Sequence, residues 1–302
     1  MTVHKPAPLT KGSTIGVVAP AGSVDEASLL AGVKAIRERG FNVELCENIG
    51  GRKGYLAGSA AQRARELEVF FRRDDIAAIF SARGGFGSIQ ILPLLNLQSA
   101  RYAKIFVGYS DITILLNWLL QAYRLVTFHG PMVAMDFAKG LSESNADRFW
   151  GILTGELRAW TCDLGEVIRP GQAVAPMMGG CLSLLVTTLG TPYEIDTRGK
   201  LLFLEDVGEK PYRIERMLTH LKMAGKLNDL AGVVCGHFAD CNGEGDRDVR
   251  QIVGEIFSEA DYPVAMGLAA GHGEENLLLP FGVAMALNAT VATLSIVESP
   301  LT

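Results

Sequence analysis

The sequence predicts an α/β protein with an N-terminal parallel-sheet domain, flanked by helices, and a smaller mixed α/β C-terminal domain. In the first half, short apolar runs alternate with segments of helical periodicity, which is typical of a parallel sheet covered by helices. The chain has 302 residues, about two domains by the usual size range, and 48% of them are hydrophobic. It can therefore bury two substantial cores.

The N-terminal domain is expected to cover residues 1–150. Its apolar runs predict strands, and the helix after the first strand stops at Gly40. The loops that follow the strands fall at one edge of the sheet, where ligands of open α/β sheets bind. The expected strands are residues 14–19, 41–45, 76–81, a run ending at Gly108 and 126–129, and the expected helices are residues 27–39, 62–73, a short helix through Leu95, and 112–123.

Between Phe149 and Pro176 the periodicity fades, so residues 151–172 are interpreted as a linker or crossover. The C-terminal domain then covers residues 173–302. The alternation of its tail predicts strands that cover one another. The other expected elements are helices at residues 182–189, 212–224 and 249–260 and strands at 200–205 and 231–235.

Charge and composition exclude several classes of partner. The net charge is -5, with Lys and Arg scattered along the chain, which argues against a nucleic-acid partner. No apolar run reaches the roughly 20 residues that span a bilayer, and the N-terminus lacks the apolar core of a signal peptide. We therefore expect no membrane partner and a cytoplasmic location. The five cysteines lack Cys-x-x-Cys spacing, so buried thiols are expected instead of disulfides or a metal site.

Ser110 follows an apolar run and the pair Gly108-Tyr109, and a helix-like segment begins immediately after it. A serine on a sharp strand-to-helix turn exposes Oγ at the sheet edge, which suits an acyl-transfer nucleophile. The second glycine of the Gly-x-Ser-x-Gly signature is missing, with Ile112 in its place. The alternative is that Ser110 only caps the helix.

A serine nucleophile needs a base, and His272 is the preferred histidine. It stands between Gly271 and Gly273, with no apolar neighbour to bury it, so a flexible loop could present the imidazole to a cleft. The alternative is an exposed loop histidine. His129 and His237 end apolar runs and are interpreted as packing residues, with His129 the next candidate base.

The acid that orients the base should lie at a strand end. Glu205 closes the apolar run 200–204 and is preferred, whereas Asp206 points to the opposite face and is the fallback. Glu205 could alternatively cap a neighbouring helix. The glycine-rich segment 83–87 follows a strand and could cradle phosphate or supply an oxyanion-hole N–H, although it lacks the lysine of a P-loop and the Gly-x-Gly-x-x-Gly pattern.

Taken together, these segments resemble the LD-carboxypeptidase family of serine peptidases. The resemblance runs in the family's order from residue 15 to about residue 285. It is carried by residues 17–22, 82–87, 108–111, 128–132, 204–214 and 271–272.

The resemblance implies a triad of Ser110 as nucleophile, His272 as base and Glu205 as its partner. It also implies an oxyanion hole made of the backbone N–H groups of Asp111 and Gly85. A homodimer with its active site between the two domains is expected, with no metal and no cofactor.

The family substrate is a muropeptide of L-alanine, D-glutamate, diaminopimelate and a terminal D-alanine. The bond that is cut joins an L centre to that D-alanine, and the reaction passes through an acyl-enzyme. Arg83 or Arg213 could bind the terminal carboxylate with a two-pronged guanidinium, and both could equally be interdomain ion pairs.

Two alternatives to this function remain. One is hydrolysis of a peptidyl or aminoacyl nucleotide amide, although the run 205–214 resembles the murein branch more closely. The other is a non-catalytic two-domain sugar- or nucleotide-binding protein, in which the serine and the histidine need not meet.

Overall fold

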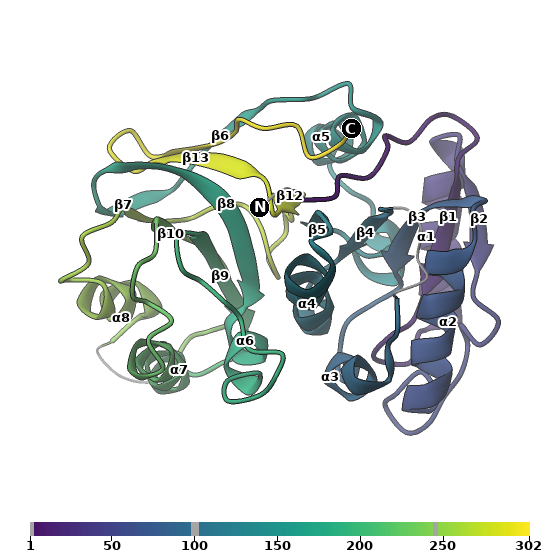
Figure 1. Ribbon diagram of the computed structural model, residues 1–302, viewed down its shortest axis with the longest axis horizontal. Coiled ribbons are helices and arrows are strands. Elements are labelled where there is room, and N and C mark those ends of the chain that lie inside the picture. Colours follow the sequence, from purple (N-terminus) through teal and green to yellow (C-terminus); the bar gives the residue numbers. More distant parts are fainter. Residues whose placement is uncertain (1–2, 98–102, 244–246) are drawn as a thin grey trace.

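The computed structural model describes residues 3–97, 103–243 and 247–302 and confirms the α/β fold. Two sheets with their helices lie next to each other (Figure 1). The first sheet has six strands in the order β12-β5-β4-β3-β1-β2, and the second has eight in the order β6-β14-β13-β8-β9-β10-β11-β7.

The first sheet is parallel except at one edge. Its parallel strands are β1 (Thr14–Val18), β2 (Asn42–Leu45), β3 (Ile76–Ser81), β4 (Ile105–Gly108) and β5 (Thr127–His129), close to the expected ranges. The edge strand β12 (Leu279–Phe281) comes from the far end of the chain and pairs antiparallel with β5. The C-terminal part of the chain therefore contributes a strand to the N-terminal sheet.

Local signals start the helices of this half. Asp25 caps α1 (Glu26–Glu38) by accepting the N–H of Ser28. Ser59 caps α2 (Ala60–Arg72) in a capping box with Gln62. The remaining helices here are α3 (Ser88–Ile91) with the 3-10 turn η1 (Leu92–Leu94), and α4 (Thr113–Tyr123).

Several elements were not expected from the sequence, among them one helix and two edge strands. Ser142 caps α5 (Glu143–Thr154), whose last turn ends at Gly155 with φ 75°. Within residues 151–172, interpreted above as a linker or crossover, β6 (Thr161–Asp163) and β7 (Glu166–Arg169) form the two edges of the second sheet. Both edge strands are short and half exposed, so they lack the apolar alternation that marks a buried strand.

The second sheet is mixed, as expected. Its parallel centre is β8 (Gln172–Cys181), β9 (Leu201–Val207), β10 (Gly232–Ala239) and β11 (Val264–Met266). The tail forms strands, as the alternation predicts, and these strands, β13 (Ala284–Asn288) and β14 (Thr293–Ile296), pair antiparallel. Its helices are α6 (Leu182–Thr187), α7 (Pro211–Met223) and α8 (Val249–Ile256).

Helix α4 joins the two halves through hydrogen bonds to β8. The Asn117 Nδ2 donates to the Gly179 carbonyl over 2.7 Å, and the Gly179 N–H donates to the Asn117 Oδ1 over 3.1 Å. The Cys181 N–H donates to Thr113 Oγ1 over 3.1 Å. A Cβ at Gly180 would lie 2.6 Å from that Oγ1, so only glycine permits this approach.

All five cysteines are buried free thiols, as expected. In the three described ranges, no helix is long and apolar enough to cross a bilayer.

Candidate active site

Ser110 lies on a sharp turn between β4 and α4. Its φ is 60°, in the left-handed region that residues other than glycine rarely adopt. The backbone passes from β4 through Tyr109 into the 3-10 turn η2 (Ser110–Ile112) and then into α4. A strained strand-to-helix turn of this kind presents a nucleophile. Helix capping does not account for Ser110, because neither η2 nor α4 has a side-chain cap.

The glycine-rich loop after β3 passes directly against this serine. A Cβ at Gly84 would lie 2.7 Å from the Ser110 Cβ, 2.8 Å from its Oγ and 3.2 Å from the Asp111 nitrogen. The next residue, Gly85, has φ 106°, which also requires glycine. The two segments that carry the Asp111 and Gly85 N–H groups are therefore adjacent.

Arg63 on α2 holds the same loop and was not identified from the sequence. Its side chain is buried, and its guanidinium donates to the Gly87 carbonyl over 2.8 Å, to the Pro20 carbonyl, and to Gln90 Oε1 over 2.8 Å. Three segments of the N-terminal half thus meet at one side chain. Charged residues are common in an amphipathic helix, so the sequence gives no sign that this arginine anchors a loop.

Glu205 and His272 form a tight pair. The His272 Nδ1 lies 2.7 Å from Glu205 Oε2, and the backbone N–H of His272 donates to the same oxygen over 3.2 Å. Glu205 is fully buried near the end of β9, whereas His272 remains partly exposed. The carboxylate therefore fixes the ring and its Nδ1–H tautomer, which leaves Nε2 as the basic nitrogen.

The glycines beside His272 serve close packing. Gly271 has φ 102°, and a Cβ there would lie 2.5 Å from Glu205 Oε2. A Cβ at Gly273 would overlap the ring of His237. The sequence suggested that these glycines make the loop flexible. The structure gives a steric reason for glycine at both positions, since a side chain would push His272 away from its carboxylate.

Burial and pairing act in opposite directions on both pKa values. Burial raises the pKa of Glu205, but the nearby His129 and the hydrogen-bonded His272 lower it to about 2. Burial lowers the pKa of His272, but Glu205, Asp206 and Asp136 raise it above its ordinary value. The carboxylate stays ionised and stabilises an imidazolium, as an orienting acid must.

The fallback acid lies elsewhere. Asp206 Oδ2 accepts the Ser183 N–H over 2.7 Å at the start of α6, so it stabilises that helix instead of orienting a histidine.

The other two strand-end histidines lie in different surroundings, and neither ring nitrogen of His129 has a hydrogen-bond partner among the described residues. The fully buried His129 packs edge-on to Phe203, and its Nε2 lies 3.9 Å from Glu205 Oε1, too far for a hydrogen bond. The His237 Nε2 lies 3.1 Å from the Glu275 carbonyl oxygen.

Tyr109 shows that the two halves of the site converge. Its ring centroid lies 4.9 Å from that of His272, and Tyr109 immediately precedes Ser110. The Tyr109 hydroxyl donates to Asp136 Oδ1 over 3.3 Å. Within the described part of the chain, no hydrogen bond joins Ser110 Oγ to His272. Contacts of this kind are often long until substrate binds.

The two arginines proposed for substrate binding occupy different surroundings. Arg83 is half-buried and donates to the Ser23 carbonyl over 3.1 Å, close to the glycine-rich loop. Arg213 is 55% exposed and pairs with Glu209 over 3.4 Å, on the same half of the chain. Each contact stays within one half of the chain, and among the described residues neither arginine forms an ion pair between the halves.

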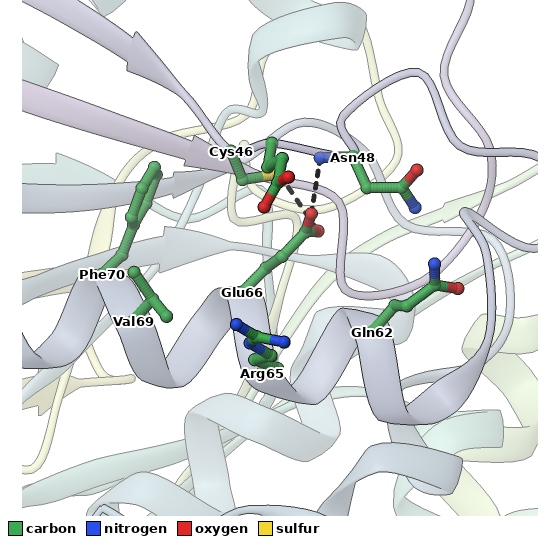
Figure 2. Close-up of a pocket in the computed structure, with 8 residues that line it drawn as sticks. Cys46, Asn48, Gln62, Arg65, Glu66, Val69 and Phe70 are labelled. Carbon is green, nitrogen blue, oxygen red and sulfur yellow. Dashed lines mark hydrogen bonds between the residues drawn. The ribbon is translucent and has the colours of Figure 1, made fainter.

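A cavity of about 500 Å³ opens beside His272. Its lining includes residues that carry no functional signal in the sequence, among them Lys139, Asn145 and Asn276. A different cavity, of about 630 Å³, lies over α2 (Figure 2). There Glu66 accepts the Asn48 N–H and the Cys46 thiol, so its carboxylate is already satisfied.

A positive-φ serine turn next to a buried carboxylate–imidazole pair, on two joined α/β sheets, defines a hydrolase of the serine-peptidase class. Residues 15–130 match the model of the LD-carboxypeptidase N-terminal domain, and residues 174–287 match that of the C-terminal domain. The chain belongs to the LD-carboxypeptidase family.

Known proteins agree with this assignment. The chain is 38% identical over 298 residues to a probable murein peptide carboxypeptidase of Bacillus subtilis, covering 96% of this chain and 93% of that protein. The structure of MccF in complex with glutamyl sulfamoyl guanosine matches with a TM-score of 0.90, 26% identity and 99% coverage of both chains. A muramoyltetrapeptide carboxypeptidase from Oxalobacter formigenes matches with a TM-score of 0.84 and 28% identity, covering 93% of this chain and 97% of that one.

Proposed function

We propose that this serine-type LD-carboxypeptidase releases the terminal D-alanine from murein tetrapeptides, by cutting the bond between an L centre and that D-alanine. The observation that carries the proposal is the 2.7 Å contact between His272 Nδ1 and Glu205 Oε2. The His272 ring also packs against the ring of Tyr109, the residue that immediately precedes Ser110. The names of the Bacillus and Oxalobacter relatives support a murein peptide as the substrate.

In the proposed mechanism His272 Nε2 takes the proton of Ser110, and Oγ attacks the scissile carbonyl. The N–H groups of Asp111 and Gly85 stabilise the oxyanion. His272 then gives its proton to the leaving amine as the C–N bond breaks, and Glu205 stabilises the imidazolium throughout. Water repeats the sequence on the acyl-enzyme and restores Ser110.

The same chemistry suits a second candidate substrate. MccF binds glutamyl sulfamoyl guanosine, so hydrolysis of a peptidyl or aminoacyl nucleotide amide is the alternative function. The first proposal includes a cellular role, in which the enzyme takes part in murein recycling. We propose that it does so in the cytoplasm and as a homodimer. Arg83 remains the proposed substrate contact on the N-terminal half, whereas the exposed pair of Arg213 with Glu209 favours a local role.

The decisive experiment is incubation of the purified protein with free tetrapeptide, with disaccharide-tetrapeptide and with a glutamyl sulfamoyl nucleotide, followed by mass spectrometry. We expect D-alanine from the first two. Ser110→Ala should abolish release while ligand binding remains, and Ser258→Ala, an exposed serine just after α8 in the other half of the chain, should behave as wild type. Turnover of the nucleotide alone would favour the alternative, and full turnover by Ser110→Ala would exclude the serine mechanism.

A further inference from the structure

The cavity beside His272 contains two buried side chains with unused hydrogen-bonding atoms. Asn145 and Asn276 are each 2% exposed. Within the described residues, Asn276 Nδ2 and Asn145 Oδ1 have no partner, which is costly for buried polar atoms. The other atoms of both amides are engaged, since Asn276 Oδ1 accepts the Gly271 N–H over 2.9 Å and Asn145 Nδ2 donates to the Asn276 carbonyl over 3.4 Å.

Charged groups complete the lining. The basic residues of the lining are His272 and Lys139. Lys139 is exposed and forms no ion pair in the described part of the chain. Asp136 and the exposed Glu274 are the acids. The Asp136 carboxylate is already occupied, because it accepts the Tyr109 hydroxyl and the Met132 N–H. The residues that line the cavity thus include a cation and two buried amides, one with an orphan donor and the other with an orphan acceptor.

The reaction direction places the leaving group here. A base that protonates the leaving amine must lie within hydrogen-bond reach of it, so the leaving residue occupies the His272 side of Ser110. On a carboxypeptidase substrate this residue is one amino acid with a free α-carboxylate. After cleavage it is a zwitterion, which needs both donors and an acceptor.

We propose that the cavity lined by Lys139, Asn145 and Asn276 is the subsite for the leaving D-amino acid. Lys139 Nζ and Asn276 Nδ2 bind its α-carboxylate, and Asn145 Oδ1 accepts a hydrogen bond from its amine. This inference rests on the proposed function and deepens it. It moves recognition of the terminal carboxylate from Arg83 to the His272 side, and leaves Arg83 for the acyl portion of the muropeptide.

The test compares two substrates that differ in one charge, the tetrapeptide and the same tetrapeptide with a C-terminal amide. Wild type should prefer the acid in kcat/KM. Lys139→Met should lower kcat/KM for the acid about tenfold to a hundredfold and leave the amide unchanged, since a hydrogen bond to a charged group is lost. Lys222→Met, an exposed lysine on α7 outside the cavity, is the matched control and should behave as wild type.

Asn276→Asp provides an independent variant, because it keeps the oxygen that accepts the Gly271 N–H and removes the orphan donor. It should also lose the preference for the acid, with its fold checked by thermal unfolding. An equal loss on both substrates in Lys139→Met, or no preference in wild type, would overturn the subsite. Absence of any hydrolysis by wild type would instead refute the proposed function, and the subsite with it.

Discussion

Glu205 gives the site its pH dependence. Its carboxylate, buried and ionised, raises the pKa of His272, and a general base works only when it is neutral. Activity should therefore be full above the raised pKa of His272 and decline as the pH falls through it. The acid limb of the kcat/KM profile is expected above pH 6.5, the ordinary value for histidine.

Replacing this carboxylate by an amide tests its role at the scale of one residue. Glu205→Gln should lower kcat by about 10²- to 10⁴-fold, because the tautomer and the imidazolium lose their partner. The remaining acid limb should move to lower pH, since the charge that raises the pKa of His272 is gone. The measurement is a pH profile of both enzymes. An unchanged limb in Glu205→Gln would show that this carboxylate does not control the base.

Gly84 offers a purely steric test. A Cβ there would lie 2.7 Å from the Ser110 Cβ, so Gly84→Ala should displace the nucleophile or the glycine-rich loop. We expect kcat to fall about 100-fold, the effect of a misplacement of about 1 Å, with a loss of about 1–3 kcal/mol in the free energy of unfolding. Gly254→Ala on α8 is the control, because nothing lies within 4 Å of its Cβ position. Normal turnover by Gly84→Ala would mean that the loop does not touch the working serine.

At the scale of elements, the helices and strands that could be predicted are those with strong local sequence signals. The strand that ends at Gly108 and the helices behind the caps Asp25 and Ser59 carry apolar runs and stop signals of their own. The edge strands β6 and β7 and the crossover strand β12 do not, because they depend on partners from distant parts of the chain. A strand of three or four residues is stabilised by its neighbour more than by its own sequence.

The anchoring of the glycine-rich loop to α2 is testable at the same scale. Arg63→Met should keep the aliphatic bulk but leave the Gly87 and Pro20 carbonyls unpaired, at a cost of about 2–4 kcal/mol in the free energy of unfolding. Urea denaturation measures this loss, and kcat should fall with it as the loop loosens. Arg65→Met, on the exposed face of the same helix, is the matched control and should change neither quantity. Equal stability of the two variants would remove Arg63 from this role.

At the scale of the molecule, the residues of the site could be predicted but their meeting could not. Ser110 follows an apolar run, Glu205 closes one, and His272 stands between glycines, so local pattern was enough to single them out. Their convergence depends on how α4 packs against β8, which no local pattern encodes. Lys139 follows the π-helical turn η3 (Val133–Phe137) and carries neither a strand-end nor a glycine signal.

Asn117 is therefore the residue through which the whole molecule can be tested. It pairs with both backbone groups of Gly179 and so holds the half that carries Ser110 against the half that carries Glu205 and His272. Asn117→Ala should cost about 2–3 kcal/mol in the free energy of unfolding, because buried backbone groups lose their partner. Turnover should fall further than this stability loss explains, since the serine and its base shift relative to each other.

The control for this variant is Asn42→Ala, in which the lost hydrogen bond, from Nδ2 to the Gly12 carbonyl, is exposed and stays within the first half. Its turnover and unfolding should match wild type within about 0.5 kcal/mol. If Asn117→Ala is destabilised but keeps wild-type kcat at a temperature where it is fully folded, the hydrogen bonds between Asn117 and Gly179 serve stability alone. A fall in kcat under those conditions would instead show that the catalytic groups are aligned by the packing of Gly179 and Gly180 in β8 against α4.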